Sequence, residues 1–221
     1  MKHLIVNADD FGLSAGINRG IVEAHRRGVL TSTSLMVDAA GADEAAGLAP
    51  ELPALSVGLH ADLPEALLDQ GGAAARAELE RQLERFTALV GRAPTHLDSH
   101  HNVHRKPPLE PVFVEVARQA GLPLREHSAA RYFAKFYGQW GGKSHLEQIA
   151  VLSLIRMLET EIADGLTELS CHPGYPDLET GYFVEREAEL RTLCDPRVPQ
   201  ALARLEIALA SYHDYPRLAG A

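Results

Sequence analysis

Cysteines and long apolar runs are what this sequence has least of. Its 221 residues include only Cys171 and Cys194, which are too few for a disulfide framework and agree with a reducing compartment. No apolar run reaches the roughly 20 residues of a membrane-spanning helix. Met1 and Lys2 lead straight into an apolar run, without the hydrophobic region of a signal peptide. We therefore expect a cytoplasmic protein with no membrane partner.

Positive charge and nucleotide-binding motifs are also lacking. The formal net charge is −9, which argues against non-specific binding to nucleic acid. Neither a glycine-rich dinucleotide fingerprint after the first apolar run nor a phosphate-binding P-loop pattern occurs. There is no internal repeat, low-complexity tract or linker, and 46% of the residues are apolar. We therefore expect residues 1–221 to form one domain with a sizeable core.

What the sequence does contain is an alternation of short apolar runs and amphipathic segments, with glycines at several helix ends. Strands are expected at 3–6, 29–36, 55–60, 95–100, 122–125, 166–172 and 207–212. Helices are expected at 14–27, with Ser14 as the cap, and at 41–49, 74–90, 107–120, 146–164, 184–193 and 197–204, and an irregular segment at 127–145. This alternation predicts an α/β fold with a parallel sheet. The number of units favours a (β/α) barrel-like fold, a distorted or incomplete TIM-type barrel, over a Rossmann fold.

The string Val6-Asn7-Ala8-Asp9-Asp10-Phe11-Gly12 places two adjacent carboxylates where the first expected strand ends. In α/β folds the carboxyl ends of parallel strands are where ligands bind. Neighbouring side chains of an extended chain point in different directions. One carboxylate can therefore ligate a metal while the other acts as a general base. The simpler interpretation is a polar turn followed by a helix cap.

Histidines lie at the ends of three other expected strands. His60 ends one strand, His172 ends another, and Asp98 precedes the run His100-His101-Asn102-Val103-His104 after a third. Each has a simpler interpretation: a satisfied polar strand end for His60, a turn cap for His172, and a solvated loop for the histidine run. Because strand ends of one polarity meet at the mouth of a parallel barrel, we expect these side chains to lie together.

This set of side chains is typical of a catalytic metal site. Two imidazoles and a carboxylate with open positions bind a divalent ion, and the imidazoles favour zinc or another transition ion. Closed structural zinc sites often use thiolates, which are missing here. A bound metal lowers the pKa of water and polarises a carbonyl. A second carboxylate can take a proton from that water, and a histidine can give one to a leaving group. The pattern therefore predicts metal-assisted hydrolysis of an acyl bond.

Five ordered motifs make the chain recognisable. They are Asn7-Ala8-Asp9-Asp10-Phe11-Gly12-Leu13-Ser14, Thr31-Ser32-Thr33, Val57-Gly58-Leu59-His60, the run from Pro94 to His104, and Cys171-His172-Pro173-Gly174-Tyr175. In this order they resemble the YdjC-like carbohydrate deacetylase family, which includes chitooligosaccharide deacetylases. The resemblance covers nearly the whole chain. It implies a (β/α) barrel-like fold, one divalent metal ion, usually described as magnesium, and removal of the N-acetyl group from an acetylated amino sugar.

The resemblance also implies roles for individual residues. Carried over by position, the metal ligands fall on Asp10, His60 and His100. Asp9 matches the general base and His172 the general acid or oxyanion partner. The expected substrate contacts are His104, which could instead stand behind the ligands, Arg125 and Tyr175.

Two departures from the family leave the substrate open. The segment 61–94 is short, and the chain has His100-His101-Asn102 where many relatives have His-His-His or His-Gln-His. Loops of this kind set substrate preference. Two alternatives remain: another metal-dependent sugar enzyme, either an isomerase or a hydrolase of a different bond, and a non-catalytic sugar-binding relative. A homo-oligomer is the default expectation for such enzymes.

Overall fold

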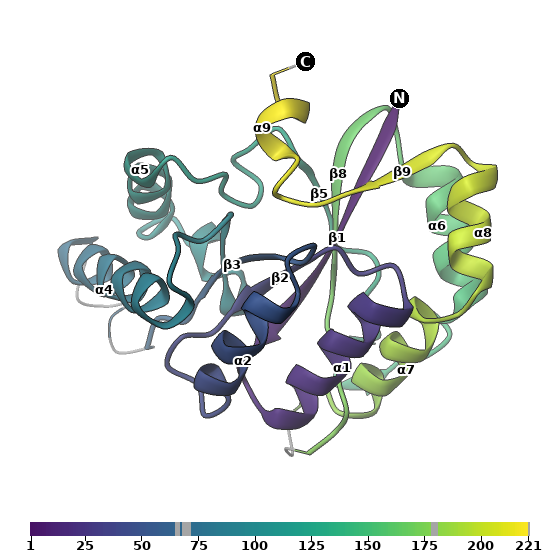
Figure 1. Ribbon diagram of the computed structural model, residues 1–221, viewed down its shortest axis with the longest axis horizontal. Coiled ribbons are helices and arrows are strands. Elements are labelled where there is room, and N and C mark those ends of the chain that lie inside the picture. The colour runs from purple at the N-terminus through teal and green to yellow at the C-terminus, as the bar shows by residue number, and fades with distance from the viewer. Residues whose placement is uncertain (65–66, 68–71, 178–180, 221) are drawn as a thin grey trace.

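The computed structural model describes residues 1–64, 67, 72–177 and 181–220, and within them seven strands form one curled parallel sheet. Figure 1 shows β1 at the centre of the sheet, with helices arranged around the outside. The strands are β1 (Lys2–Phe11), β2 (Ser32–Leu35), β3 (Ser56–Ala61), β4 (Leu97–Ser99), β5 (Arg131–Phe133), β8 (Gly165–Cys171) and β9 (Ile207–Ala210). A separate antiparallel pair is formed by β6 (Gln139–Trp140) and β7 (Lys143–Ser144).

Helices connect the strands and cover the sheet. They are α1 (Ala15–Arg27), α2 (Ala42–Leu48), η1 (Ala49–Glu51), α4 (Gly72–Val90), η2 (His100–Arg105), α5 (Glu110–Ala120), α6 (Val151–Glu161), α7 (Val184–Leu193), α8 (Arg197–Arg204) and α9 (Tyr215–Leu218). The cap of α1 is confirmed, because the Ser14 side chain accepts a hydrogen bond from the backbone N–H of Ile17 at 3.2 Å. Among the described residues, no helix combines the length and the apolar character that a bilayer-spanning segment requires.

The order of the strands shows a barrel that is left open. It runs β4-β3-β2-β1-β8-β5, with every neighbouring pair parallel. β9 also pairs in parallel with β1, along Lys2 to Ile5. Of the strands described, β4 and β5 stand at the two ends of this order, so the sheet curls without closing between them. The prediction of a (β/α) barrel-like, incomplete fold is confirmed.

Several expected elements between residues 107 and 164 differ from the structure. The strand expected at 122–125 is only a single parallel bridge, between Leu97 and Leu124. Pro123 has no N–H to extend a ladder there, although its carbonyl accepts a hydrogen bond from the Leu97 N–H. The strand β5 instead lies within the segment 127–145, which the sequence predicted to be irregular. The helices expected at 107–120 and 146–164 are shorter, because α5 begins at Glu110 and α6 spans only Val151–Glu161.

Strand β1 presents its side chains alternately to the helices and to the interior of the curled sheet. In β1, Leu4, Val6 and Ala8 belong to the main apolar cluster beneath the helices, as period-two alternation predicts. The side chains between them point the other way, where Ile5 joins a second, small apolar cluster. Farther along the strands, Arg125 contacts Asp9 of β1, Asp98 of β4 and Glu168 of β8. The curled sheet therefore surrounds a buried, charged interior that leads up to the strand ends.

Candidate active site

The polar side chains expected at the strand ends lie together. Asp9 and Asp10 are near the end of β1, His60 is near the end of β3, His100 follows β4, and His172 follows β8. All five line one cavity of about 510 Å³. They come from four parallel strands, so their meeting follows from the common direction of those strands.

A bulge at the end of β1 lets both carboxylates reach this cavity. The pairing of β1 with β2 shifts by one residue between Ala8 and Phe11. Asp10 has a φ of 70°, in the left-handed region that is rare for residues other than glycine. Gly12 follows with a φ of 90°, and a Cβ there would meet Leu35 Cδ1 at 2.9 Å. The bulge and the turn therefore aim two adjacent carboxylates at one cavity in different directions, at a local cost in backbone strain.

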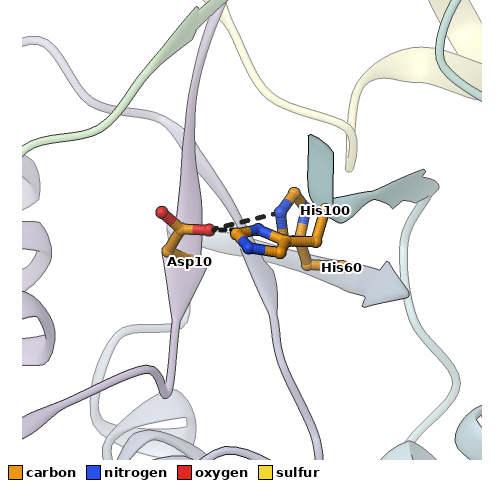
Figure 2. Close-up of side chains that lie close together, drawn as sticks. All are labelled: Asp10, His60 and His100. Atoms are coloured by element: carbon orange, nitrogen blue, oxygen red, sulfur yellow. Dashed lines mark ion pairs between the residues drawn. The ribbon is translucent and has the colours of Figure 1, made fainter. Parts of the chain in front are cut away.

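Asp10, His60 and His100 form a group that could hold a metal ion (Figure 2). Asp10 Oδ1 is 3.3 Å from His60 Nε2 and 3.2 Å from His100 Nδ1. These are the separations expected of neighbouring ligand atoms, because atoms about 2.1 Å from one ion at angles of 90–110° lie about 3.0–3.4 Å apart. Asp10 Oδ1 is buried and has no well-oriented hydrogen-bond donor. The residues present therefore fit a divalent ion.

A carboxylate behind His60 orients its ring. His60 Nδ1 is 2.7 Å from Asp98 Oδ1, which turns Nε2 toward Asp10. Ser34 Oγ donates to the other oxygen of Asp98 at 2.9 Å. Carboxylate–histidine pairs of this kind commonly support metal-binding imidazoles. Asp9, His60 and Asp98 are also close enough to hold an ion. However, the Arg125 guanidinium lies 2.7 Å from both Asp9 and Asp98. Its positive charge therefore already balances the carboxylates of this second group.

Asp9 is held from two sides. Both of its oxygens accept hydrogen bonds from Arg125, at 2.8 and 2.7 Å, and Asn7 donates a third at 2.9 Å. Arg125 is in turn held by Glu168, which accepts from Nε at 2.9 Å and from Nη2 at 2.7 Å. On the cavity side, Asp9 Oδ2 is 3.8 Å from His172 Nε2. Asp9 is thus a fixed carboxylate between a buried guanidinium and a cavity imidazole.

Opposite charges keep the metal-competent group ionised in spite of burial. Burial acts to raise the pKa of Asp10, but its close contacts with the His100 and His60 imidazoles and the charge of Arg186 hold it well below its usual value. Burial acts to lower the pKa of His60, but Asp98 and Asp10 raise it to about 10. A metal ion bound at His60 would compete with a proton for the lone pair of Nε2.

His172 behaves differently from His60. Burial lowers its pKa, and the nearby carboxylates Asp9 and Asp10 only partly offset this. The imidazole is therefore neutral near neutral pH. Its Nδ1 atom is buried without a hydrogen-bond partner.

The three residues expected to contact substrate do not line the cavity, as far as the described residues define it. His104 is fully buried, with its Nδ1 2.7 Å from Ser99 Oγ. Arg125 lies beneath Asp9, as described above. The Tyr175 hydroxyl donates to Glu23 of α1 at 2.5 Å. Their side chains already have partners inside the protein.

Sequence reasoning missed an arginine and an aromatic wall. Arg186 lines the cavity and donates to Asp10 Oδ2 at 2.6 Å. Tyr137 and Tyr182 also line it and stack on each other, with ring centroids 4.7 Å apart. Arg186 belongs to α7, where Glu185 and Glu189 are buried as well. The burial of these three charged side chains is seen only in the structure, since their sequence is also that of an exposed helix face.

The chain is similar to several known proteins over nearly its whole length. A family model described as YdjC-like protein matches residues 3–204. A carbohydrate deacetylase of Geobacillus stearothermophilus is 36% identical, over 98% of this chain and 99% of that protein. A chitooligosaccharide deacetylase of Yersinia pestis (strain Pestoides F) is 35% identical, over 96% of this chain and 99% of that protein. The alignments span 253 and 256 positions, more than the 221 residues of this chain, so both relatives carry insertions that it lacks.

A solved structure shows the same fold. A protein of Enterococcus faecalis V583 superposes with a TM-score of 0.83 at 27% identity, over 96% of this chain and 98% of that one. The family match and the two relatives cover nearly all of the sequence, including every strand end that supplies the cavity. This chain belongs to the YdjC-like family.

Proposed function

We propose that this protein is a metal-dependent hydrolase that removes the N-acetyl group from an acetylated amino sugar or chitooligosaccharide and releases acetate. The observation that carries the proposal is the convergence of Asp10, His60 and His100 beside Asp9 and His172 in one cavity. The names of the two relatives, carbohydrate deacetylase and chitooligosaccharide deacetylase, support the class of substrate and the bond that is cleaved.

Asp10, His60 and His100 would hold one divalent ion. When bound, the ion would polarise the acetyl carbonyl and lower the pKa of a water molecule. The two imidazoles favour zinc or another transition ion, whereas the resemblance favours magnesium. Arg186 and Asp98 act on the ligands from behind, since Arg186 holds Asp10 and Asp98 orients His60.

Asp9 is the proposed base and His172 the proposed acid. Asp9 accepts a proton from the water that attacks the acetyl carbonyl, and Arg125 keeps the carboxylate in place for this step. His172 is neutral at the start, so it must gain a proton before it can donate one. The 3.8 Å between Asp9 Oδ2 and His172 Nε2 provides a short route for that proton. His172 then protonates the amine as the C–N bond breaks, which leaves acetate and a free amino sugar.

Product analysis tests this function. The metal-loaded protein is incubated with N-acetylglucosamine oligomers, and acetate and free amine are measured with and without a chelator. We expect equal amounts of acetate and amine, formed only when metal is present. An isomerase would change the sugar without releasing acetate, and a sugar-binding protein would bind the oligomer without changing it. Either outcome, or unchanged acetate release in Asp10→Ala and His60→Ala, would exclude the proposed reaction.

A further inference from the structure

Glu189 joins α7 to the residue that follows β8. Its side chain is completely buried, and its carboxyl Oε2 accepts a hydrogen bond from the backbone N–H of His172. Its other oxygen, Oε1, is hydrogen-bonded to the hydroxyl of Tyr182. One carboxyl group therefore spans two parts of the cavity wall that are ten residues apart in sequence, because both His172 and Tyr182 line the cavity.

The Tyr182 end of this link is firmly anchored. The Tyr182 hydroxyl also accepts a hydrogen bond from the Gly138 N–H at 2.8 Å. The ring stacks on Tyr137 at an interplanar angle of 8°. Because Tyr182 is held at both its ring and its hydroxyl, Glu189 Oε1 is held in one position. The remaining oxygen, Oε2, is thereby kept against the His172 N–H.

The same face of α7 holds the segment after His172 in a second place. The Gly174 N–H donates to the Arg186 carbonyl at 3.2 Å, one helical turn before Glu189. A Cβ at Gly174 would approach Ile17 at 3.1 Å, and a Cβ at Gly20 would meet Gly174 at 2.5 Å. The backbone from His172 to Gly174 is therefore packed between α1 and α7, and the Glu189 side chain supplies the hydrogen bond that holds it at His172.

Packing alone does not call for a carboxyl group at this position. Burial raises the pKa of Glu189 to about 8, although hydrogen bonds from His172 and Tyr182 and the charge of Arg186 counteract this. Burying this carboxyl group costs free energy of desolvation, which its hydrogen bonds to His172 and Tyr182 offset. The neighbouring buried positions of α7, Leu190 and Leu193, are apolar. What the carboxyl group adds is a directed hydrogen bond to a cavity residue.

We propose that Glu189 is a positioning residue, which fixes the backbone of His172 and so the place from which the imidazole acts. The proposal rests on the function proposed for His172 above. The carboxyl group of Glu189 can accept a hydrogen bond from the His172 N–H whether or not it is protonated. A glutamine side chain has the same length, and its amide oxygen can accept the same hydrogen bond. We therefore expect a variant that keeps a hydrogen-bond acceptor at this position to retain the role even without an acidic group. A variant without the acceptor should lose the role.

Kinetics of four variants test the role. Glu189→Leu removes the acceptor, and Glu189→Asp withdraws it by one methylene group. In both, kcat for acetate release should fall about tenfold or more while KM stays within about threefold, since a hydrogen bond that sets geometry is lost. Glu189→Gln should stay within about threefold of the parent in kcat. The matched control is Glu185→Leu, one turn earlier in α7, where an equally buried carboxyl group contacts Gln139 and Ser144 instead of His172.

Amide exchange tests the contact without any substrate. In the parent protein and in Glu189→Gln, the His172 backbone amide should exchange slowly with deuterium. In Glu189→Leu and Glu189→Asp it should exchange about tenfold faster or more, and in Glu185→Leu it should match the parent. Should Glu189→Leu not fold, Glu189→Asp decides, because it keeps a polar group at the site.

The possible failures are separate. The positioning role is wrong if folded Glu189→Asp keeps the parent kcat and amide exchange, or if Glu189→Gln loses as much kcat as Glu189→Leu, since charge or proton transfer would then be the requirement. It is also wrong if Glu185→Leu lowers kcat equally. If the parent releases no acetate from any substrate, the proposed function fails, while the exchange rates still decide whether Glu189 fixes His172.

Discussion

The guanidinium of Arg125 holds both carboxylate oxygens of Asp9, with Nη1 2.8 Å from Oδ2 and Nη2 2.7 Å from Oδ1. The same group contacts Asp98 and Glu168, so one buried cation serves three buried carboxyl groups. Burial acts against its charge, yet these three partners hold the pKa of Arg125 above its usual value. Arg125 was expected to contact substrate; its position in the structure is that of a support for Asp9.

Removing Arg125 should destabilise the fold as well as the site. Arg125→Met leaves three carboxyl groups without their cation, and breaking a buried ion pair costs about 3–5 kcal/mol. We expect the free energy of unfolding in urea to fall by about that amount. Arg118→Met is the matched control, because Arg118 pairs with Glu115 at an exposed site and its removal should leave stability nearly unchanged. Equal stability of the two variants would contradict the role of Arg125.

Metal affinity should depend on the ligands and on the carboxylate behind them in a graded way. Asp98→Asn weakens the support of His60 and should reduce affinity about 10–100-fold, as is typical of such outer partners. Asp10→Ala removes a ligand and should reduce affinity further, beyond about 100-fold. Calorimetric titration of metal-free protein with zinc and with magnesium measures both. An Asp10→Ala protein that binds the ion as tightly as Asp98→Asn would rule out Asp10 as a ligand.

Asp9 and Asp10 should separate into two functions. Asp9→Asn keeps the three metal-competent side chains and should bind metal within a few-fold of the parent protein. Loss of the base should nevertheless slow acetate release about 10²–10⁴-fold. Asp10→Asn should lose affinity for the ion as well as activity. The division fails if Asp9→Asn remains active, or if it loses the metal to the same degree as Asp10→Asn.

Glu189 should make stability depend on pH in a known direction. Its pKa is raised by burial from 4.5 to about 8, so the folded protein binds this proton more tightly than the unfolded chain. Stability should therefore fall as pH rises from about 5 to about 8, by on the order of a few kcal/mol, and Glu189→Gln should not share this loss. The groups facing the carboxyl group are the Tyr182 hydroxyl, the His172 N–H, Arg186 and Asp9.

Urea unfolding of the parent protein and Glu189→Gln across this pH range checks the sign. The advantage of the glutamine variant should grow with pH and level off above about pH 8. A difference that stays constant, or that shrinks as pH rises, would show that the buried carboxyl group does not hold its proton in the folded state.

Much of the fold was predictable because its signals are local. Apolar runs, the Ser14 cap and glycine stops specify strands and helices within a few residues of sequence. In a parallel sheet the C-terminal ends of all strands lie on the same side, and this arrangement brings His60 and His100 to Asp10. The strand β5 was missed because it is three residues long and lies in a segment without periodicity. The strand expected at 122–125 is reduced to one bridge at Leu124, because Pro123 has no N–H to extend the pairing.

The partners of the site residues were not predictable, because they depend on contacts between distant parts of the chain. Arg186 reaches Asp10 across 176 positions, and Arg125 reaches Asp9 across 116. Nothing near either arginine in sequence distinguishes an inward guanidinium from an exposed one. The roles of Asp9 and His172, the cytoplasmic location and the oligomeric state stay predictions.

Titration of metal-free protein with a divalent ion, while acetate release from an N-acetylglucosamine oligomer is followed, tests the central claim most directly. The rate should rise linearly with added ion and reach its plateau at one equivalent per chain, and Asp10→Ala should stay flat over the same range because the ion loses a ligand that lies 3.3 and 3.2 Å from its two histidine partners. Acetate release that is independent of the ion, or activation of Asp10→Ala to the same extent as the parent protein, would contradict a metal-dependent deacetylase built on Asp10, His60 and His100.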